Sequence, residues 1–503
     1  MAVTVAIDTL GCKVNQAESE QLARQLAAAG YHMVAPDAAA DICILNTCTV
    51  THIADRKSRH WLRLAHRRNP DATLVVTGCY AELAAADLAK IEGVKLVVAN
   101  ADKHRLVEIL RESLFSSPLR ERLGEDEPSE IFQVNSASVT STGSVTTSSV
   151  TAADSVTEPT LATPGGIEPF FPDSSFRTRA FIKVQDGCRN FCAYCIVPFV
   201  RRNEESLLPD TVISEINKRE TEGYKEVVIT GVEVGSYQYI SKIKNQKSKP
   251  QLKSQILFPD SPVRDSLGDG EAVGLTKLLS LILENTTIPR LRLSSLQPPE
   301  VTRELLALWQ NPRLCRHFHL SLQSGSDTVL QRMGRRYTIA DYARAVALIR
   351  AVVPGPAITT DIIVGFPGET DEEFAAGCAF CKQMEFARLH VFPYSPRKGT
   401  RAAGFSNPVD EKTKKQRMDK YLVLAEECIR NFSRKFLGST MPVLLEQKDK
   451  GLWSGLTDNY IRVFVDNEED LTNRIVPVKM VEVWGEGMRG ELIENNTNTT
   501  NAK

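Results

Sequence analysis

Residues 179–195 read RAFIKVQDGCRNFCAYC, a short apolar strand followed at once by three cysteines, Cys188, Cys192 and Cys195. A structural zinc site normally takes four protein ligands, whereas this Cys-x3-Cys-x2-Cys spacing supplies only three. Three thiolates can hold a cubane of four irons and leave one iron without a protein ligand. The spacing therefore favours a [4Fe-4S] cluster with one open iron, and a zinc or purely structural site is the alternative.

Six apolar strands alternate with helices over the surrounding part of the chain. In order they are RAFIKVQ, KEVVITG, RLRLSS, HFHLSLQS, ITTDIIVGF and RLHVFPY, between residues 179 and 395. Six strand–helix steps predict a partial (βα)6 barrel, whose chemistry lies beyond the carboxyl ends of the strands. The lysine-rich stretch SKIKNQKSKPQLKSQ interrupts this pattern within about 238–272. We interpret it as a solvated insertion, with an RNA-contacting loop as the alternative.

The first block, residues 1–112, carries a second set of three cysteines. Its strands VTVAID, DICILN, TLVVTG and KLVVAN alternate with helical stretches, which predicts a doubly wound parallel sheet. Cys12, Cys48 and Cys79 each lie just past one of these strands, and the carboxyl ends of parallel strands share one rim of the sheet. Three soft thiolates there suit a second iron–sulfur cluster, again with an open iron. Isolated cysteines that pack as small hydrophobic residues are the alternative.

Composition divides the remainder of the chain. The stretch SASVTSTGSVTTSSVTAADSVTEPT is rich in Ser, Thr and Val, which is typical of a low-complexity linker. The last strands alternate apolar and polar residues between glycine turns, which predicts a small all-β barrel. The expected organisation is a linker at 113–175, a core at 176–405, a helical connector at 406–435, a β barrel at 436–494 and a tail at 495–503.

Five further cysteines have positions that favour packing. Cys43 lies inside the strand DICILN, and Cys378 and Cys381 share one face of the amphipathic stretch TDEEFAAGCAFCKQMEF. We also assign Cys315 and Cys428 to the core.

Length and charge limit the classes of function. The chain has 503 residues, 24% charged and 42% hydrophobic, enough for two or three domains. It begins MAVTVAIDTLGC, without a signal-peptide pattern, and it has no apolar stretch of about eighteen residues that could span a bilayer. We therefore expect a cytoplasmic protein without a membrane partner, in a compartment where clustered cysteines favour metal ligation over disulfides. The net charge of −1 gives no overall attraction to nucleic acid.

The triplet of cysteines resembles the signature of the radical S-adenosylmethionine enzymes, including the aromatic Tyr194 just before the last cysteine. This resemblance implies that the open iron chelates the amino and carboxylate groups of S-adenosylmethionine. It also implies that an electron from the cluster breaks a carbon–sulfur bond and releases a 5′-deoxyadenosyl radical.

Further motifs resemble the methylthiotransferases along nearly the whole chain. They are TLGCKVNQAESE, NTCTVT and TGCY in the first block, then QDGCRNFCAYCIVP, SLQPPE, LQSGSD, MGRRYT, DIIVGFPGET and FPYSPRKGTRAA. Within that family, GCKVNQ and VFPYSPRKGT are most similar to the branch that modifies N6-threonylcarbamoyladenosine, beside the anticodon of certain tRNAs. The near alternatives are the branches that act on isopentenyladenosine and on a ribosomal-protein aspartate. A non-catalytic iron–sulfur protein that binds RNA or senses redox state is the alternative from another class.

The resemblance implies methylthiolation at C2 of the adenine, with two [4Fe-4S] clusters and S-adenosylmethionine as cofactors. The cluster on Cys188, Cys192 and Cys195 would make the radical, and the cluster on Cys12, Cys48 and Cys79 would hold the sulfur. Matching barrel loops imply cofactor contacts at Tyr194, Gly231, Gln323 and Gly365, although the glycines could equally serve only as turn residues. No catalytic acid or base is expected, because the C2–H bond is not acidic enough for general base catalysis. The implied partners are a tRNA anticodon loop, an electron donor and a sulfur source.

Two departures from the family pattern and one basic helix bear on substrate contacts. RRNEES stands where the family tends to have Arg-Gly and then Arg-Ser, and Glu233 stands where Asn or His is more common. The stretch HIADRKSRHWLRLAHRRNP has six Lys and Arg against one acid, so it predicts an RNA-binding helix, with an ordinary solvated face as the alternative. The last β module resembles the RNA-holding TRAM domain, but its acidic residues outnumber its basic ones.

Overall fold

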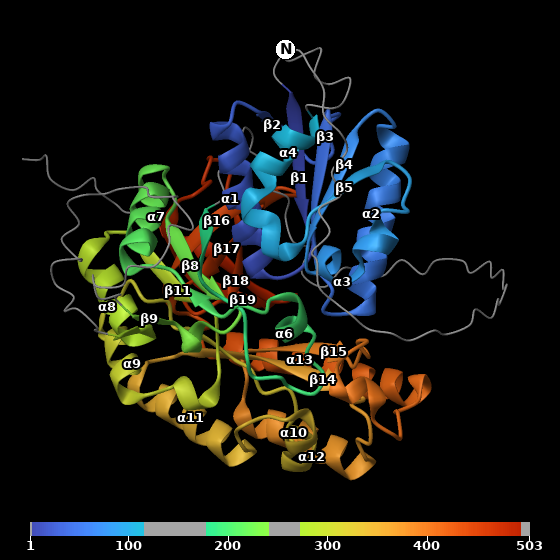
Figure 1. Ribbon diagram of the computed structural model, residues 1–503. Coiled ribbons are helices and arrows are strands. Elements are labelled where there is room, and N and C mark those ends of the chain that lie inside the picture. Colours follow the sequence, from blue (N-terminus) through green and yellow to red (C-terminus); the bar gives the residue numbers. More distant parts are fainter. Residues whose placement is uncertain (1–2, 115–177, 241–271, 494–503) are drawn as a thin grey trace, which may run out of the picture. The chain divides into compact units, whose positions relative to one another are not determined.

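The computed structural model describes residues 3–114, 178–240 and 272–493 (Figure 1). The linker expected at 113–175 begins two residues late, because Ser113 and Leu114 belong to a helix. The rest of it, the tail and nearly all of the lysine-rich insertion lie outside the described residues. Among the described residues, no helix combines the length and the apolar character needed to cross a membrane.

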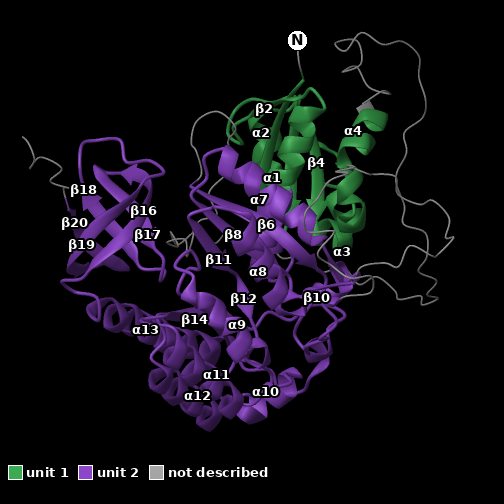
Figure 2. Ribbon diagram, turned by 90° about the vertical axis from the view of Figure 1, so that its left-hand side faces the viewer, with its two compact units in different colours: residues 1–11, 19–48, 56–173 green, residues 12–18, 49–55, 174–503 purple. Residues whose placement is uncertain are grey.

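Two compact units make up the chain (Figure 2). Unit 1 comprises residues 1–11, 19–48 and 56–173, and unit 2 comprises residues 12–18, 49–55 and 174–503. Two short segments of the N-terminal block therefore belong to unit 2 by their contacts. One of these segments begins at Cys12, and the other begins directly after Cys48.

The sheet of the N-terminal block has five parallel strands in the order β2-β1-β3-β4-β5. The strands are β1 (Thr4–Thr9), β2 (His32–Val34), β3 (Ile42–Thr47), β4 (Thr73–Gly78) and β5 (Val94–Val97). The intervening helices are α1 (Lys13–Ala28), α2 (His52–Arg68), α3 (Cys79–Leu88), the 3-10 helix η1 (Asn100–Arg105) and α4 (Leu106–Leu114).

Apolar side chains on both faces of this sheet pack against helices. Val5 packs with Leu26 of α1 and with residues of α4, whereas Leu45 packs with Leu62 of α2 and with residues of α3. All six residues of β3 are consequently buried, as in a parallel strand covered by helices on both faces. The four strands expected from the sequence are present, and the short edge strand β2 is an addition.

The six strands expected for the barrel are also present, divided between two four-stranded sheets, β11-β8-β6-β7 and β12-β13-β14-β15. They are β6 (Arg179–Asp186), β8 (Glu226–Gly231), β11 (Arg290–Leu293) with its continuation β12 (Ser295–Leu296), β13 (His317–Leu320), β14 (Ala357–Val364) and β15 (Arg388–Pro393). Apart from the antiparallel edge strand β7 (Glu205–Ser206), the paired strands run parallel. The third expected strand is therefore shared between the two sheets, which part at Ser294.

Helices and short connections accompany these strands. The helices are α6 (Val197–Val200), α7 (Pro209–Thr221), α8 (Leu275–Asn285), α9 (Arg303–Ala307), α10 (Asp327–Met333), α11 (Ile339–Val352) and α12 (Asp371–Met384). The 3-10 helices are η2 (Val234–Ser236), η3 (Pro298–Glu300), η4 (Leu308–Gln310) and η5 (Arg401–Gly404). At the two ends of the expected insertion, β9 (Gln238–Ile240) and β10 (Ala272–Gly274) form an antiparallel pair that the sequence did not indicate.

The C-terminal strands close into a barrel in the order β16-β17-β18-β20-β19. They are β16 (Thr440–Asp449), β17 (Leu452–Thr457), β18 (Arg462–Asp466), β19 (Ile475–Trp484) and β20 (Gly487–Leu492). The expected helical connector is α13 (Glu411–Arg434). Tyr421 and Leu424 of this helix join the core of the large barrel, and Phe432 joins the core of the small one. The connector is thus an integral packing element of unit 2.

A buried ion pair links the large barrel to the small one inside unit 2. Arg292 donates to Glu226 over 2.6 and 3.1 Å, and the two side chains are 1% and 0% exposed. The same guanidinium donates to the backbone carbonyls of Thr457 and Asp458. Burial alone would raise the pKa of the Glu226 carboxyl, but the neighbouring arginines, Arg292 foremost, outweigh it and lower the pKa to about 2.

Glu226→Gln should therefore lower the free energy of unfolding by about 3 kcal/mol at pH 7, because it leaves a buried guanidinium without its counter-charge. Since the carboxyl pKa falls from its ordinary 4.5 to about 2 on folding, the wild-type advantage should be complete above pH 4.5 and vanish towards pH 2. Urea unfolding followed by circular dichroism measures this difference. Asp458→Asn breaks the more exposed pair with Arg316 and should lower the free energy of unfolding by about 1 kcal/mol or less. Equal losses of stability in the two variants would contradict the conclusion that burial makes the Glu226–Arg292 pair the more costly one to break.

Candidate active site

The loop after β6 carries Cys188, Cys192 and Cys195 and is held by backbone bonds. Gly187 has φ of +74°, and a Cβ there would lie 2.0 Å from the carbonyl oxygen of Asn203, so only glycine fits. The amide of Ala193 donates to the Met333 carbonyl over 2.7 Å. The three cysteines that the sequence groups together are therefore presented by one anchored loop at the carboxyl end of β6.

The surroundings of these thiols suit an iron–sulfur cluster. The amide of Asn190 donates to Cys188 Sγ over 3.5 Å, and Arg335 Nη1 donates to Cys192 Sγ over 3.2 Å. Burial raises the pKa of Cys188 to about 11 and that of Cys195 to about 12. Bound iron would supply the positive charge that converts such thiols into thiolate ligands.

No three His, Cys, Asp or Glu side chains within residues 3–114, 178–240 and 272–493 converge to hold a single metal ion. A cubane does not require such convergence, because each thiolate binds a different iron.

The four residues expected to contact S-adenosylmethionine end or follow barrel strands, or belong to the cysteine loop itself. Gly231 ends β8, and a Cβ there would lie 3.0 Å from the Gln185 side chain. Gln323 has φ of +70°, and Gly365, directly after β14, has φ of +73°. The positive φ of Gly365 explains its identity without a ligand. The cofactor contacts of Tyr194, Gly231, Gln323 and Gly365 stay predictions.

Arg335 is a site residue that the sequence reasoning missed. Besides its bond to Cys192 Sγ, its Nη2 donates to Gln297 Oε1 over 3.0 Å, and its guanidinium lies over the Tyr337 ring at 4.7 Å. It lies in the motif MGRRYT, which carries part of the family resemblance but does not by itself indicate a contact with a cysteine.

The two departures from the family pattern have structural partners. Glu233 accepts a hydrogen bond from Asn190 Nδ2 over 3.0 Å and lies 3.9 Å from Cys188 Sγ. Burial and the adjacent Glu233 carboxylate raise the pKa of Glu300 to about 8. A Cβ at Gly235 would lie 1.8 Å from the Glu300 carboxyl carbon, so this glycine makes room for the acid. In RRNEES, Arg201 is buried whereas Arg202 is exposed.

The second set of cysteines follows neighbouring strands of the five-stranded sheet. Cys48 and Cys79 come directly after Thr47 and Gly78, which pair in register across β3 and β4. Cys12 follows β1, the neighbour of β3 on its other side, and belongs to unit 2. The strand order reverses between β1 and β3, the kind of point at which open α/β sheets bind ligands.

The position of Cys79 depends on a constrained glycine. Gly78 has φ of +99°, and a Cβ there would lie 2.4 Å from the Thr47 carbonyl oxygen and 2.6 Å from Asn46 Oδ1. Cys79 itself begins α3, where the helix N-terminus favours a thiolate. Cys48 and Cys79 are 7% and 6% exposed, so this part of the sheet offers two sheltered soft ligands.

The remaining cysteines are placed as expected. Cys43, Cys315, Cys381 and Cys428 are buried, and Cys378 packs against the core of the large barrel. All eleven cysteines lie within the described ranges, and none of them forms a disulfide.

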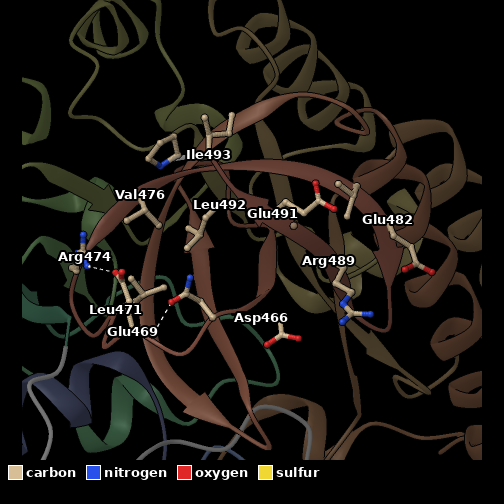
Figure 3. Close-up of a pocket in the computed structure, with 14 residues that line it drawn as sticks. Asp466, Glu469, Leu471, Arg474, Val476, Glu482, Arg489, Glu491, Leu492 and Ile493 are labelled. Atoms are coloured by element: carbon tan, nitrogen blue, oxygen red, sulfur yellow. Dashed lines mark hydrogen bonds and ion pairs between the residues drawn. The ribbon is translucent and has the colours of Figure 1, made fainter. Parts of the chain in front are cut away.

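The charged surfaces differ between the basic helix and the small barrel. On α2, Arg56, Lys57, Arg63, Arg67 and Arg68 are exposed. The small barrel instead has a cavity of about 760 Å³ (Figure 3). Its charged lining residues are Asp466, Glu469, Glu482, Glu491, Arg474 and Arg489. Acids outnumber bases in this cavity, so it does not suit a phosphate backbone.

Comparison with known proteins assigns both cysteine-bearing segments to families. Residues 4–99 match the model described as "Uncharacterized protein family UPF0004", and residues 182–381 match the "Radical SAM superfamily". The "Threonylcarbamoyladenosine tRNA methylthiotransferase MtaB" of Bacillus subtilis (strain 168) is 33% identical, covering 98% of this chain and 97% of the relative. The chain belongs to the radical S-adenosylmethionine methylthiotransferases.

Further relatives and one solved structure are also similar to this methylthiotransferase. The Thermotoga maritima protein of the same name is 35% identical, covering 92% of each chain. A "tRNA-2-methylthio-N(6)-dimethylallyladenosine synthase" of Syntrophobacter fumaroxidans is 31% identical over 97% of this chain and 95% of the relative. The solved radical S-adenosylmethionine methyltransferase TsrM from Kitasatospora setae aligns with a TM-score of 0.47 and 15% identity, covering 78% of this chain and 73% of that one. Methylthiotransferases carry two [4Fe-4S] clusters and use S-adenosylmethionine, so the two sets of cysteines are our candidates for the ligands.

Gly78→Ala should reduce the iron content of the anaerobically reconstituted chain by about half, to about four irons. The added Cβ forces the β4–α3 turn away from β3 and displaces Cys79. Iron and acid-labile sulfide analysis measures the loss. Gly30→Ala is the control: it also replaces a positive-φ glycine, but nothing lies within 4 Å of its Cβ, so it should cost stability alone. Full iron content in Gly78→Ala would contradict a cluster at Cys79.

Proposed function

We propose that this chain methylthiolates C2 of N6-threonylcarbamoyladenosine next to the anticodon of tRNA. The observation that carries the proposal is the pairing of a Cys-x3-Cys-x2-Cys loop after β6 with three cysteines that follow β1, β3 and β4. One set of cysteines would suffice for a radical S-adenosylmethionine enzyme that adds no sulfur. The branch assignment is supported by the names of relatives from Bacillus subtilis and Thermotoga maritima.

Each set of cysteines has its own task in this proposal. Cys188, Cys192 and Cys195 would hold the cluster that, with S-adenosylmethionine bound, supplies the radical that removes the C2 hydrogen. Cys12, Cys48 and Cys79 would hold the cluster that carries the sulfur. The cofactors thus perform the difficult chemistry, and the protein contributes position and shelter.

The barrel residues contribute electrostatics and shape. Arg335 donates to Cys192 Sγ, and a cation against a thiolate ligand stabilises the negative charge of a cluster. We propose that Tyr194, Gly231, Gln323 and Gly365 line the S-adenosylmethionine site, with Arg335 and Glu233 beside it. No side chain serves as a general acid or base on the adenine.

For the tRNA, we propose contacts through the exposed cations of α2 and through the C-terminal barrel, taken as TRAM-like, on a surface other than its acidic cavity. A base in the anticodon loop is already unpaired, so its presentation to the cluster should cost only a few kcal/mol of unstacking. An electron donor and a sulfur source complete the partners. Eleven cysteines, all within the described ranges and none in a disulfide, suit a reducing compartment, for which we propose the cytoplasm.

The test is anaerobic turnover of the reconstituted enzyme with dithionite, S-adenosylmethionine, sulfide and tRNA that carries either threonylcarbamoyladenosine or isopentenyladenosine. Nucleoside mass spectrometry should detect the 2-methylthio product on the first tRNA. Cys188→Ala should abolish formation of 5′-deoxyadenosine, whereas Cys48→Ala should retain it and lose the methylthio product. Cys381→Ala, a buried core cysteine, is the control for general damage.

Each outcome bears on a different part of the proposal. Product on the isopentenyladenosine tRNA alone would reject the substrate assignment. If the wild-type protein formed no 5′-deoxyadenosine, the proposal of radical S-adenosylmethionine catalysis would be rejected. An iron–sulfur protein that senses redox state would then be favoured. Equal loss of both products in Cys48→Ala would reject the division of tasks.

A further inference from the structure

Arg201 is the centre of a buried charge network inside unit 2. Its Nη1 donates to Glu18 Oε1 at 2.8 Å and to both oxygens of Asp186 at 2.8 and 3.0 Å. Its Nη2 donates to Asn15 Oδ1 and Glu18 Oε2, both at 2.9 Å. Lys183 Nζ donates to both Glu18 and Asp186 at 2.8 Å. The network therefore contains two cations and two carboxylates, and the Arg201 side chain is only 2% exposed.

The partners of Arg201 lie beside two candidate ligand cysteines. Asn15 and Glu18 are in the first part of α1, which begins at the residue after Cys12. Asp186 is the last residue of β6, two positions before Cys188. One guanidinium thus bonds to the chain just after Cys12 and to the chain just before Cys188.

Arg397 makes an analogous set of contacts, also inside unit 2. Its Nη1 lies 2.7 Å from Asp55 Oδ2 and its Nη2 donates to Thr49 Oγ1, with side-chain exposures of 3% for Arg397 and 9% for Asp55. Thr49 is the residue after Cys48. The amide of His52 donates to Ser395 Oγ over 3.0 Å, so the loop after β15 holds this segment at two points.

The bonds described above join both arginines to side-chain oxygens on the segments that follow Cys12 and Cys48, whereas Arg335 donates to Cys192 Sγ. Both use the planar fork of the guanidinium, which donates to two partners in fixed directions, and a lysine cannot reproduce this geometry.

We propose that Arg201 and Arg397 are positioning residues for methylthio transfer, which fix the chain segments after Cys12 and Cys48 against the barrel that carries Cys188. The inference rests on the proposed function, in which sulfur must reach the carbon radical before the radical is lost. Small displacements of reacting groups reduce rates about 100-fold. Loss of either arginine should therefore separate S-adenosylmethionine cleavage from product formation.

The test measures the ratio of methylthiolated nucleoside to 5′-deoxyadenosine for Arg201→Lys and Arg397→Lys, with tRNA carrying threonylcarbamoyladenosine. We expect this ratio to fall about tenfold or more, with 5′-deoxyadenosine within about twofold of wild type and iron content unchanged. A purely structural role would lower both products together. Glu18→Gln should reproduce the effect of Arg201→Lys, and the double variant should add little to it, because both break one interaction.

Arg219→Lys is the matched control. Its side chain is 6% exposed and paired with Glu215 and Glu222, which do not belong to the segments that follow Cys12 and Cys48, so the product ratio should stay at the wild-type value. If Arg201→Lys does not fold, Asn15→Ala removes one neutral partner of the same guanidinium and should still lower the ratio. A wild-type ratio in the variants, or loss of half their iron, would overturn the inference. Absence of product from the wild-type enzyme would instead reject the proposed function.

Discussion

The carboxyl ends of neighbouring parallel strands lie at the same edge of a sheet. The placement of the candidate sites in this molecule depends on that constraint. In the five-stranded sheet, residues that follow β3 and β4 emerge side by side because Thr47 and Gly78 are paired in register. In the large barrel, the loops after β6, β8 and β14 leave the same edge for the same reason. Cysteines some thirty residues apart can therefore serve one site without a local motif. The barrel cysteines differ in this respect, because Cys188, Cys192 and Cys195 all lie on the one loop after β6.

Buried ion pairs are the second recurring feature of this molecule. Arg292 of β11 pairs with Glu226, the first residue of β8. Arg201 pairs with Glu18 and with Asp186, which lies just before the cysteine loop. Such pairs contribute little net stability compared with apolar packing, but a partner left alone is costly. Their value here is geometric, since a buried fork accepts only one arrangement of its acceptors. They suit an enzyme whose reactive groups must meet before a radical is lost.

Local sequence patterns predicted much of the fold. The six barrel strands, the four main strands of the first block and the C-terminal barrel each have a clear apolar period, so their existence followed from the sequence. The short strands β2, β7, β9 and β10 have two or three residues each, too few for a period. The cysteine loop could be recognised because its three cysteines, our candidate ligands, lie within eight positions. Arg201 and Arg335 could not, because their importance arises from partners more than 130 positions away.

The central claim is that each set of three cysteines leaves one iron of a cubane open to a reactant. Mössbauer spectroscopy of the ⁵⁷Fe-reconstituted chain, before and after addition of S-adenosylmethionine, tests this claim most directly. The account predicts the signal of two [4Fe-4S] clusters, with about one iron in eight changing its coordination when the cofactor binds. A single cluster, or two clusters whose irons are all unaffected by S-adenosylmethionine, would contradict it.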